Sequence, residues 1–86
     1  MAKYRVLLKR SAVREVHRIP RKVLRQILDR IASLRSQPRP PGGEKLSAQE
    51  QYRIRQGDYR IIYGISDADL TVVVVKIAHR RDVYRQ

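Results

Sequence analysis

The strongest constraint on the fold is a two-residue turn between two runs of alternating side chains. Residues 52–56 and 59–65 both alternate, and Gly57 and Asp58 separate them. Glycine at the first turn position tolerates the positive φ that a type II′ turn requires, and such turns join adjacent antiparallel strands. The sequence therefore predicts a β-hairpin whose register is set by this turn.

This register sorts the hairpin side chains onto two faces, because successive residues of a strand point in opposite directions. The expected core face carries Tyr52, Ile54, Ile61 and Tyr63. The other face carries Arg53, Arg55 and Arg60, with Arg55 directly opposite Arg60. Like charges at paired positions cost up to about 1 kcal/mol, and neither run contains an acidic residue to offset them. We interpret this face as an anion site; a solvated face with splayed arginines is the alternative.

Two helices are predicted before the hairpin. Ser11 is the expected N-cap of a short helix over residues 12–18, and Pro20 stands where a second helix can begin. The second helix is defined by an apolar stripe at helical spacing, formed by Leu24, Ile27, Leu28, Ile31 and Leu34. Arginine and lysine lie largely off this stripe, so the helices should form an antiparallel pair with a basic outer surface.

Strands are predicted at both ends of the chain. Residues 4–8 alternate as a first strand, and residues 70–78 are valine-rich on both faces, which predicts a central strand buried on both sides. A loop rich in proline and glycine, residues 37–44, is too short to separate two domains. The order β-α-α-β-β-β predicts one α+β domain over residues 1–86, with a helical hairpin packed on a mostly antiparallel four-stranded sheet.

The charge of the chain indicates a polyanionic partner. Lysine and arginine number 20 against 8 acidic residues, which gives a net charge of +12, and arginine supplies 15 of the 20. Guanidinium groups bind phosphate through two parallel hydrogen bonds, so this excess favours a nucleic acid, above all RNA. A solvated basic surface is the alternative, and an anionic membrane is disfavoured because the chain has no Trp or Phe. Without cysteine or a leader-like segment, a cytoplasmic protein with no Cys-based metal site is expected.

The segment after the last strand adds candidates to the arginine face. His79 and Arg80 follow that strand and are expected to reach the same face. If the segment is helical, Arg80 and Tyr84 share a side, which suits a phosphate and a stacked base. The alternatives are that Tyr84 closes the edge of the core and that His79 is an ordinary surface residue.

Residues 52–63 (YRIRQGDYRIIY), a valine-rich strand and residues 79–84 (HRRDVY) together resemble the RelE family of toxins. The order of the predicted elements agrees with that family along nearly the whole chain. The resemblance implies a microbial-ribonuclease-like fold and the toxin of a type II toxin–antitoxin pair. It implies an mRNA endoribonuclease (an mRNA interferase) that acts at the ribosome and is neutralised by an antitoxin wrapped around it. The net charge of +12 predicts that this antitoxin has an acidic, amphipathic or disordered segment. The family's functional positions match Arg53, Arg55, Arg60, Arg80 and Tyr84.

Such cleavage is expected to need no metal or other cofactor, because the RNA 2′-hydroxyl attacks the phosphorus while guanidiniums stabilise the developing charge. Family members often carry Lys where this chain has Arg53 and Arg55, and arginine cannot serve as a base. His79 is therefore predicted to carry the proton, with Glu50 as a second candidate. Two other functions stay open: a ParE-like toxin that inhibits DNA gyrase, and a module that binds RNA without cutting it.

Overall fold

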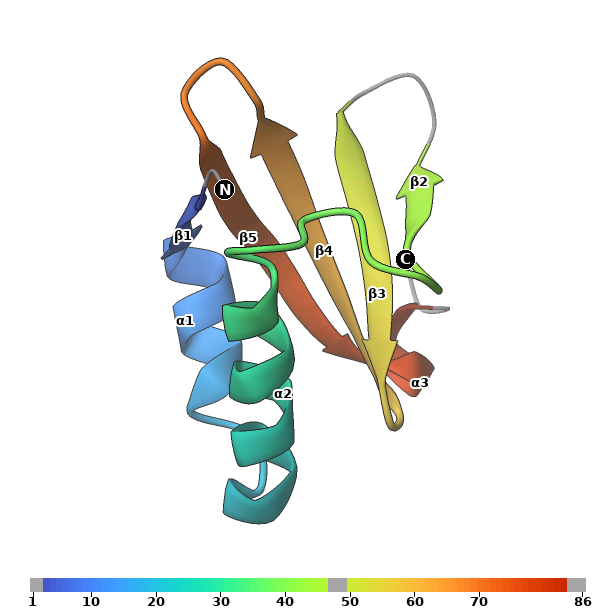
Figure 1. Ribbon diagram of the computed structural model, residues 1–86. Helices are drawn as coiled ribbons and strands as arrows, with labels where there is room; N and C mark the ends of the chain where they lie inside the picture. The colour runs from blue at the N-terminus through green and yellow to red at the C-terminus, as the bar shows by residue number, and fades with distance from the viewer. Residues whose placement is uncertain (1–2, 47–49, 84–86) are drawn as a thin grey trace.

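The computed structural model describes residues 3–46 and 50–83. In this part of the chain, two helices follow the first strand, and four more strands and a helical turn follow them. The order is β1 (Arg5–Leu8), α1 (Arg10–Val16), α2 (Arg21–Ser33), β2 (Glu44–Leu46), β3 (Gln51–Gln56), β4 (Tyr59–Ser66), β5 (Thr71–His79) and α3 (Arg80–Val83). Helices α1 and α2 lie side by side and antiparallel on one side of the sheet (Figure 1). The predicted α+β architecture is confirmed.

The sheet has five strands in the order β1-β5-β4-β3-β2. β1 pairs with β5 in parallel, and the other neighbours are antiparallel. The expected count of four strands is wrong by one edge strand, β2. That strand has only three residues and directly follows the loop rich in proline and glycine. Three residues are too few for alternation to reveal a strand, so pairing with β3 is what defines it.

The predicted register of the β3–β4 hairpin is confirmed. Tyr52 pairs with Tyr63, and Arg55 pairs with Arg60. Gly57 has a φ of 60°, the positive value that a type II′ turn requires at its first position. The hairpin therefore presents an apolar face to the helices and an arginine-bearing face away from them.

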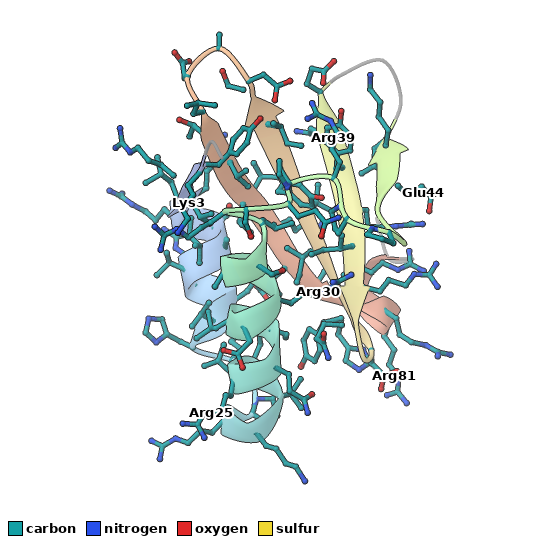
Figure 2. All side chains as sticks on the ribbon, viewed as in Figure 1. Lys3, Arg25, Arg30, Arg39, Glu44 and Arg81 are labelled. Carbon is teal, nitrogen blue, oxygen red and sulfur yellow. The ribbon has the colours of Figure 1, made fainter. Side chains whose placement is uncertain are left out.

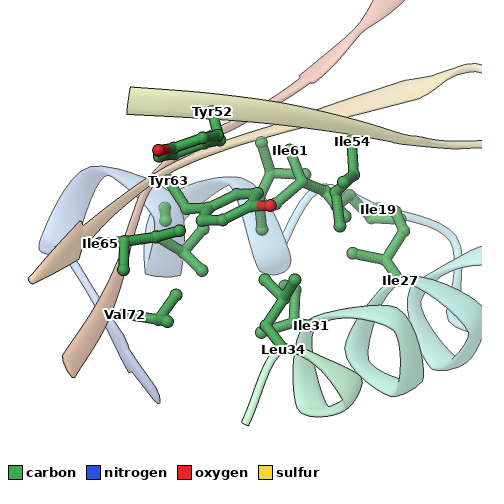
Figure 3. Close-up of a cluster of buried hydrophobic side chains, with 13 residues drawn as sticks. Ile19, Ile27, Ile31, Leu34, Tyr52, Ile54, Ile61, Tyr63, Ile65 and Val72 are labelled. Carbon is green, nitrogen blue, oxygen red and sulfur yellow. The ribbon is translucent and has the colours of Figure 1, made fainter. Parts of the chain in front are cut away.

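The core lies between this hairpin face and α2. Tyr63, Ile54 and Ile61 are fully buried, and Figure 3 shows the side chains of α2 and the residue that ends it, Leu34, facing them. Leu28 is 41% exposed, so its place in the predicted apolar stripe is wrong. It lies on the edge of the stripe that turns away from the sheet, where none of the described elements covers it.

The start of α1 differs from the prediction. The helix begins at Arg10, and Lys9 occupies the N-cap without a side-chain hydrogen bond. Ser11 is therefore not the cap; its hydroxyl donates to the backbone carbonyl of Val75 at 2.9 Å. β1 pairs with β5 only as far as Val74, so this hydroxyl joins α1 to the part of β5 that β1 does not cover.

β5 is an interior strand, as expected, but its two faces are not equally buried. Val72 and Val74 are fully buried, whereas Val73 and Val75 are partly exposed. Both helices pack on the same side of the sheet (Figure 1), so the predicted burial on both sides, or nearly so, is wrong for most of the other face. Ala78, which pairs with Arg60 on that face, is the buried exception among these residues. A β-bulge in β5 lies opposite the step from Ile62 to Tyr63 of β4. The extra residue changes which side the following residues of β5 face, and these residues remain paired with β4.

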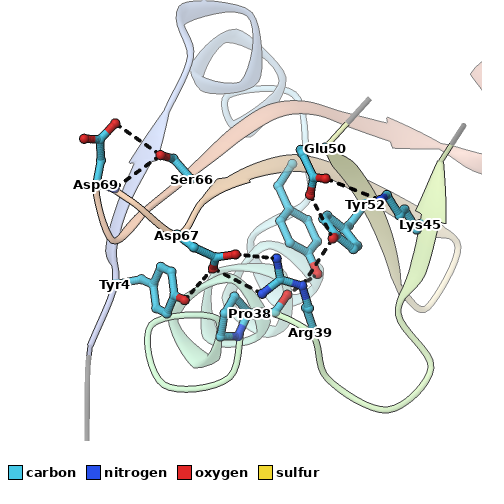
Figure 4. Close-up of polar contacts among 10 residues, drawn as sticks. Tyr4, Pro38, Arg39, Lys45, Glu50, Tyr52, Ser66, Asp67 and Asp69 are labelled. Carbon is cyan, nitrogen blue, oxygen red and sulfur yellow. Dashed lines mark hydrogen bonds and ion pairs between the residues drawn. The ribbon is translucent and has the colours of Figure 1, made fainter. Parts of the chain in front are cut away.

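A polar network fastens the loop after α2 to the sheet at the end away from the hairpin turn (Figure 4). Arg39 donates two hydrogen bonds to the carboxylate of Asp67, at 3.2 and 2.9 Å, and a third to the hydroxyl of Tyr52 at 3.2 Å. The bonds from Arg39 lower the pKa of Asp67. Beside this network, the hydroxyl of Tyr63 donates to the carbonyl of Pro38 at 2.7 Å, and burial raises the pKa of Tyr63 to about 12.

Candidate functional site

A cavity of about 330 Å³ lies at the turn of the β3–β4 hairpin, beside α3. Its lining combines the last residues of β3, the turn, the first residues of β4 and the start of α3: Arg55, Gly57, Asp58, Tyr59, Arg60 and Arg80. Three arginines and one aspartate thus line one hollow. Figure 1 shows α3 next to the hairpin turn, and Figure 2 shows that the cationic side chain of Arg81 lies in the same region.

The hairpin register brings two of the three arginines together. Arg55 and Arg60 are directly paired across β3 and β4, so their side chains leave the same face of the sheet. Arg55 is exposed, and Arg60 is partly buried. The prediction that these two residues share a face is confirmed, and the turn that sets the register is the local reason for it.

α3 supplies the third arginine and is attached to the hairpin turn. The backbone N–H of Arg80 donates to the carbonyl of Asp58 at 2.7 Å. The guanidinium of Arg80 lies 4.0 Å from the carboxylate of Asp58. This attachment places a residue from the end of the described chain beside Arg55 and Arg60, as expected for Arg80.

Arg53 is on the same face but does not line the cavity. It pairs with Glu44 of β2 in the sheet register, and its guanidinium donates to the carboxylate of Glu44. The side chain of Arg53 is only 18% exposed, whereas that of Glu44 is 62% exposed. The expectation that no acid offsets the arginines is therefore wrong for Arg53, because the unpredicted edge strand carries that acid.

His79 does not reach the arginine face. It pairs with Tyr59 across β4 and β5, and Tyr59 packs against the helix-covered core. The two rings meet edge to face with centroids 5.2 Å apart. Directly paired residues point to the same side of a sheet, so His79 lies on the face opposite Arg60. The expected convergence of His79 with the arginines is wrong, and the pleat of the sheet is the reason.

The other two candidates are placed as follows. Glu50 precedes β3 at the end away from the cavity, where its carboxylate accepts a hydrogen bond from Tyr52 at 3.2 Å. Tyr84 lies outside the described residues. Asp58, which was predicted only as a turn residue, is also among the residues that line the cavity. The signal that could have found it is its position next to the Arg55–Arg60 pair.

The electrostatic character of the cavity suits an anion. Each guanidinium can donate two parallel hydrogen bonds to phosphate oxygens. Two of them belong to the end of the β3–β4 hairpin and the third to the start of α3. Within the described ranges, no group of three His, Cys, Asp or Glu side chains is arranged to hold a metal ion.

A second basic surface lies on the helices, where the exposed side chains include Arg10, Arg14, Arg18, Arg21, Lys22 and Arg25. No helix in the part of the chain described is long and apolar enough to span a membrane.

Comparison with known proteins agrees with this architecture. A family model described as the ParE toxin of the type II toxin–antitoxin system parDE matches residues 6–84. The toxin RelG of Mycobacterium tuberculosis is 29% identical over 85 residues, which cover 96% of this chain and 98% of that protein.

Solved structures extend the likeness to the fold. The toxin–antitoxin complex RelBE2 of M. tuberculosis contains a chain that is 29% identical, with a TM-score of 0.82 and coverage of 93% of this chain and 94% of that one. The archaeal RelE–RelB complex of Pyrococcus horikoshii has a chain that is 28% identical, with a TM-score of 0.83 and coverage of 98% and 99%. The isolated RelE toxin of E. coli shares the fold at 19% identity, with a TM-score of 0.79. This chain therefore belongs to the RelE/ParE superfamily of toxins from type II toxin–antitoxin systems.

Proposed function

We propose that this toxin is an endoribonuclease that cleaves mRNA at the ribosome. The observation that carries the proposal is the convergence of Arg55, Arg60 and Arg80 around one cavity. A pentacovalent phosphorus transition state carries more negative charge on its oxygens than the ground state does. Donors held in advance around that charge are usually the largest single contribution to such catalysis.

The proposed reaction uses the RNA as its own nucleophile. The 2′-hydroxyl attacks the adjacent phosphorus in line, the bond to the 5′-oxygen breaks, and the products carry a 2′,3′-cyclic phosphate and a 5′-hydroxyl. In this scheme Arg55 and Arg60 bind the non-bridging oxygens of the phosphate, and Arg80 contacts the phosphate from a third side. Arg53 is committed to Glu44, so we assign it a supporting role at the edge of the site.

The basic helix surface fits a ribosomal location. Its exposed arginines and lysine, such as Arg25 in Figure 2, lie on other elements than the cavity and can contact the phosphates of structural RNA. Contacts of this kind carry no sequence information but position a protein on its substrate. Binding should accordingly weaken steeply as salt rises.

We also propose a cognate antitoxin as the protein partner. Related toxins have been solved in complex with RelB antitoxins. A net charge of +12 favours a partner segment that is acidic and that folds on the toxin surface. Co-expression with such a partner should restore growth to cells that produce this toxin.

Inhibition of DNA gyrase is the second candidate, because the matching family model bears the name of the ParE toxins. One pair of assays separates the two functions. Purified toxin is added to ribosomes programmed with a defined mRNA, and separately to gyrase with supercoiled DNA. New RNA 3′ ends bearing a cyclic phosphate support the ribonuclease, whereas gyrase-linked DNA breaks without RNA cleavage refute it. Arg55→Ala is the test variant, and Arg5→Ala on the edge strand β1 is the matched control that removes the same charge from an exposed position outside both the cavity and the basic helix surface.

A further inference from the structure

The proposed ribonuclease has an unassigned proton acceptor. Deprotonation of the 2′-hydroxyl helps the attack, but guanidinium groups have no lone pair with which to accept the proton. His79 lies on the other face of the sheet, and Glu50 lies at the far end of β3. An acceptor that serves this cavity has to be within its lining.

We propose that Asp58 is the general base of this site; this inference rests on the proposed ribonuclease function. Asp58 is the acidic residue among those that line the cavity. It lies in the turn between the strands that carry Arg55 and Arg60, and its carboxylate is 4.0 Å from the guanidinium of Arg80. The oxygens of a carboxylate accept hydrogen bonds and can accept a proton. The arginines can therefore hold the phosphate while Asp58 faces the neighbouring 2′-hydroxyl.

The backbone around Asp58 is fixed, while its carboxylate is accessible. Gly57 sets the turn, and the carbonyl of Asp58 accepts the N–H of Arg80 at 2.7 Å. The side chain is 66% exposed, and the nearest guanidinium nitrogen of Arg80 is 4.0 Å from it. That separation is longer than the ~2.7–2.9 Å of a charge-assisted hydrogen bond, so the carboxylate keeps lone pairs to offer to a substrate.

Glu44 provides the contrast on the same face. Its carboxylate is in direct contact with Arg53, and it does not line the cavity. Its negative charge is thus committed to one partner at the sheet edge. Glu44 and Asp58 both carry a carboxylate. That of Glu44 forms a structural ion pair, and in our proposal that of Asp58 transfers a proton.

The step balances as follows. A carboxylate oxygen of Asp58 takes the proton of the 2′-hydroxyl as the 2′-oxygen forms its bond to phosphorus. The bond from phosphorus to the 5′-oxygen breaks, and the leaving oxygen takes a proton from water. The proton on Asp58 then passes to solvent. No oxidant, reductant or further reactant is needed.

The competing role for Asp58 is to position Arg80 through their ion pair. The two roles differ in what they do to binding and to pH dependence. If Asp58 only positions Arg80, its loss should weaken RNA binding and slow cleavage equally at every pH. If Asp58 is the base, RNA binding should be unchanged when it is lost. The wild-type cleavage rate should fall at acidic pH as a carboxylate becomes protonated, and the variant should lack this fall.

The test uses Asp58→Asn, with Asp58→Glu as the conservative variant and Glu44→Gln as the matched loss of a carboxylate outside the cavity. Single-turnover cleavage of mRNA on programmed ribosomes is measured across pH, and binding is measured with RNA that carries 2′-deoxy at the cut position. Asp58→Asn should cleave about 10²–10⁴ times more slowly. It should bind the deoxy RNA as tightly as wild type or more tightly, because a negative charge is gone. Asp58→Glu should recover part of the rate, and Glu44→Gln should keep the wild-type pH profile.

Two results would overturn the inference while the proposed function stands: Asp58→Asn that cleaves at the wild-type rate, or a loss that is equal at all pH values and accompanied by weaker binding. Wild-type toxin that fails to cleave overturns both proposals. Asparagine is well tolerated in tight turns. If the asparagine variant nevertheless does not fold, the pH profiles of wild type and Asp58→Glu decide. Profiles without an acid-side fall in rate would refute the base role.

Discussion

Replacing Tyr63 by phenylalanine tests how the loop after α2 is held to the sheet. The ring is fully buried, and its hydroxyl donates to the carbonyl of Pro38 at 2.7 Å. The variant keeps the ring and removes only this bond, which leaves a partly buried carbonyl without its donor. We expect the free energy of unfolding at neutral pH to fall by about 1–2 kcal/mol. In a domain of this size each 1 kcal/mol lowers the melting temperature by roughly 4–8 °C.

The same residue makes a distinct prediction at high pH. Burial raises the pKa of Tyr63 from 10.0 to about 12, which corresponds to about 3 kcal/mol. Because the folded-state pKa is the higher one, this contribution is fully present below pH 10 and is lost as the pH rises through about 12. The Tyr63→Phe variant has no such group to ionise. Its stability should therefore decline less, and the curves of wild type and variant should converge and cross.

The assay is chemical denaturation followed by circular dichroism at a series of pH values, with Tyr59→Phe as control. That variant also loses one phenol of the hairpin, but from a half-buried ring near the other end of β4. It should retain the alkaline loss of stability that wild type shows. Equal stability of Tyr63→Phe and wild type at neutral pH, or parallel decline of the two above pH 10, would refute the reasoning.

Three further predictions concern the cavity and the polar network. Arg60→Ala should abolish toxicity on induction, because the cavity loses one of the guanidiniums proposed to hold the phosphate; a folded variant that still arrests growth would contradict the site. His79→Ala should cleave RNA at nearly the wild-type rate, since its ring lies on the opposite face; a loss near 10²–10⁴, as for a general acid or base, would return the proton transfer to it. Asp67→Asn should be less stable than wild type at neutral pH, and the difference should vanish as acid protonates Asp67 through its lowered pKa; urea melts across acidic pH measure this, and a difference that persists in acid would count against the ion pair.

Much of the fold and part of the site could be predicted from local sequence. The Gly57–Asp58 turn set the hairpin register, and alternation then placed Arg55 opposite Arg60. These features depend on neighbours in the chain and on the period-two pleat of a strand, which sequence carries directly. Helix periodicity was sufficient to place Ile27 and Ile31 in the core but not to exclude Leu28.

Features that depend on distant pairing were decided only in three dimensions. β2 is too short to show a pattern, and pairing with β3 created both the edge strand and the contact between Glu44 and Arg53. Ser11 had a local capping role available, but the carbonyl of Val75 offered a tertiary acceptor instead.

The composition of the cavity shows the same division. The arginine pair comes from one turn, whose geometry is local. The exclusion of His79 comes from the pairing of β5 with β4, and the inclusion of Arg80 comes from a hydrogen bond to the turn residue Asp58. Sequence determines which face a side chain takes within one hairpin, because the pleat alternates without reference to the rest of the molecule. Which residues from separate elements then meet is decided by strand register and loop closure, since these depend on contacts between residues far apart in the chain.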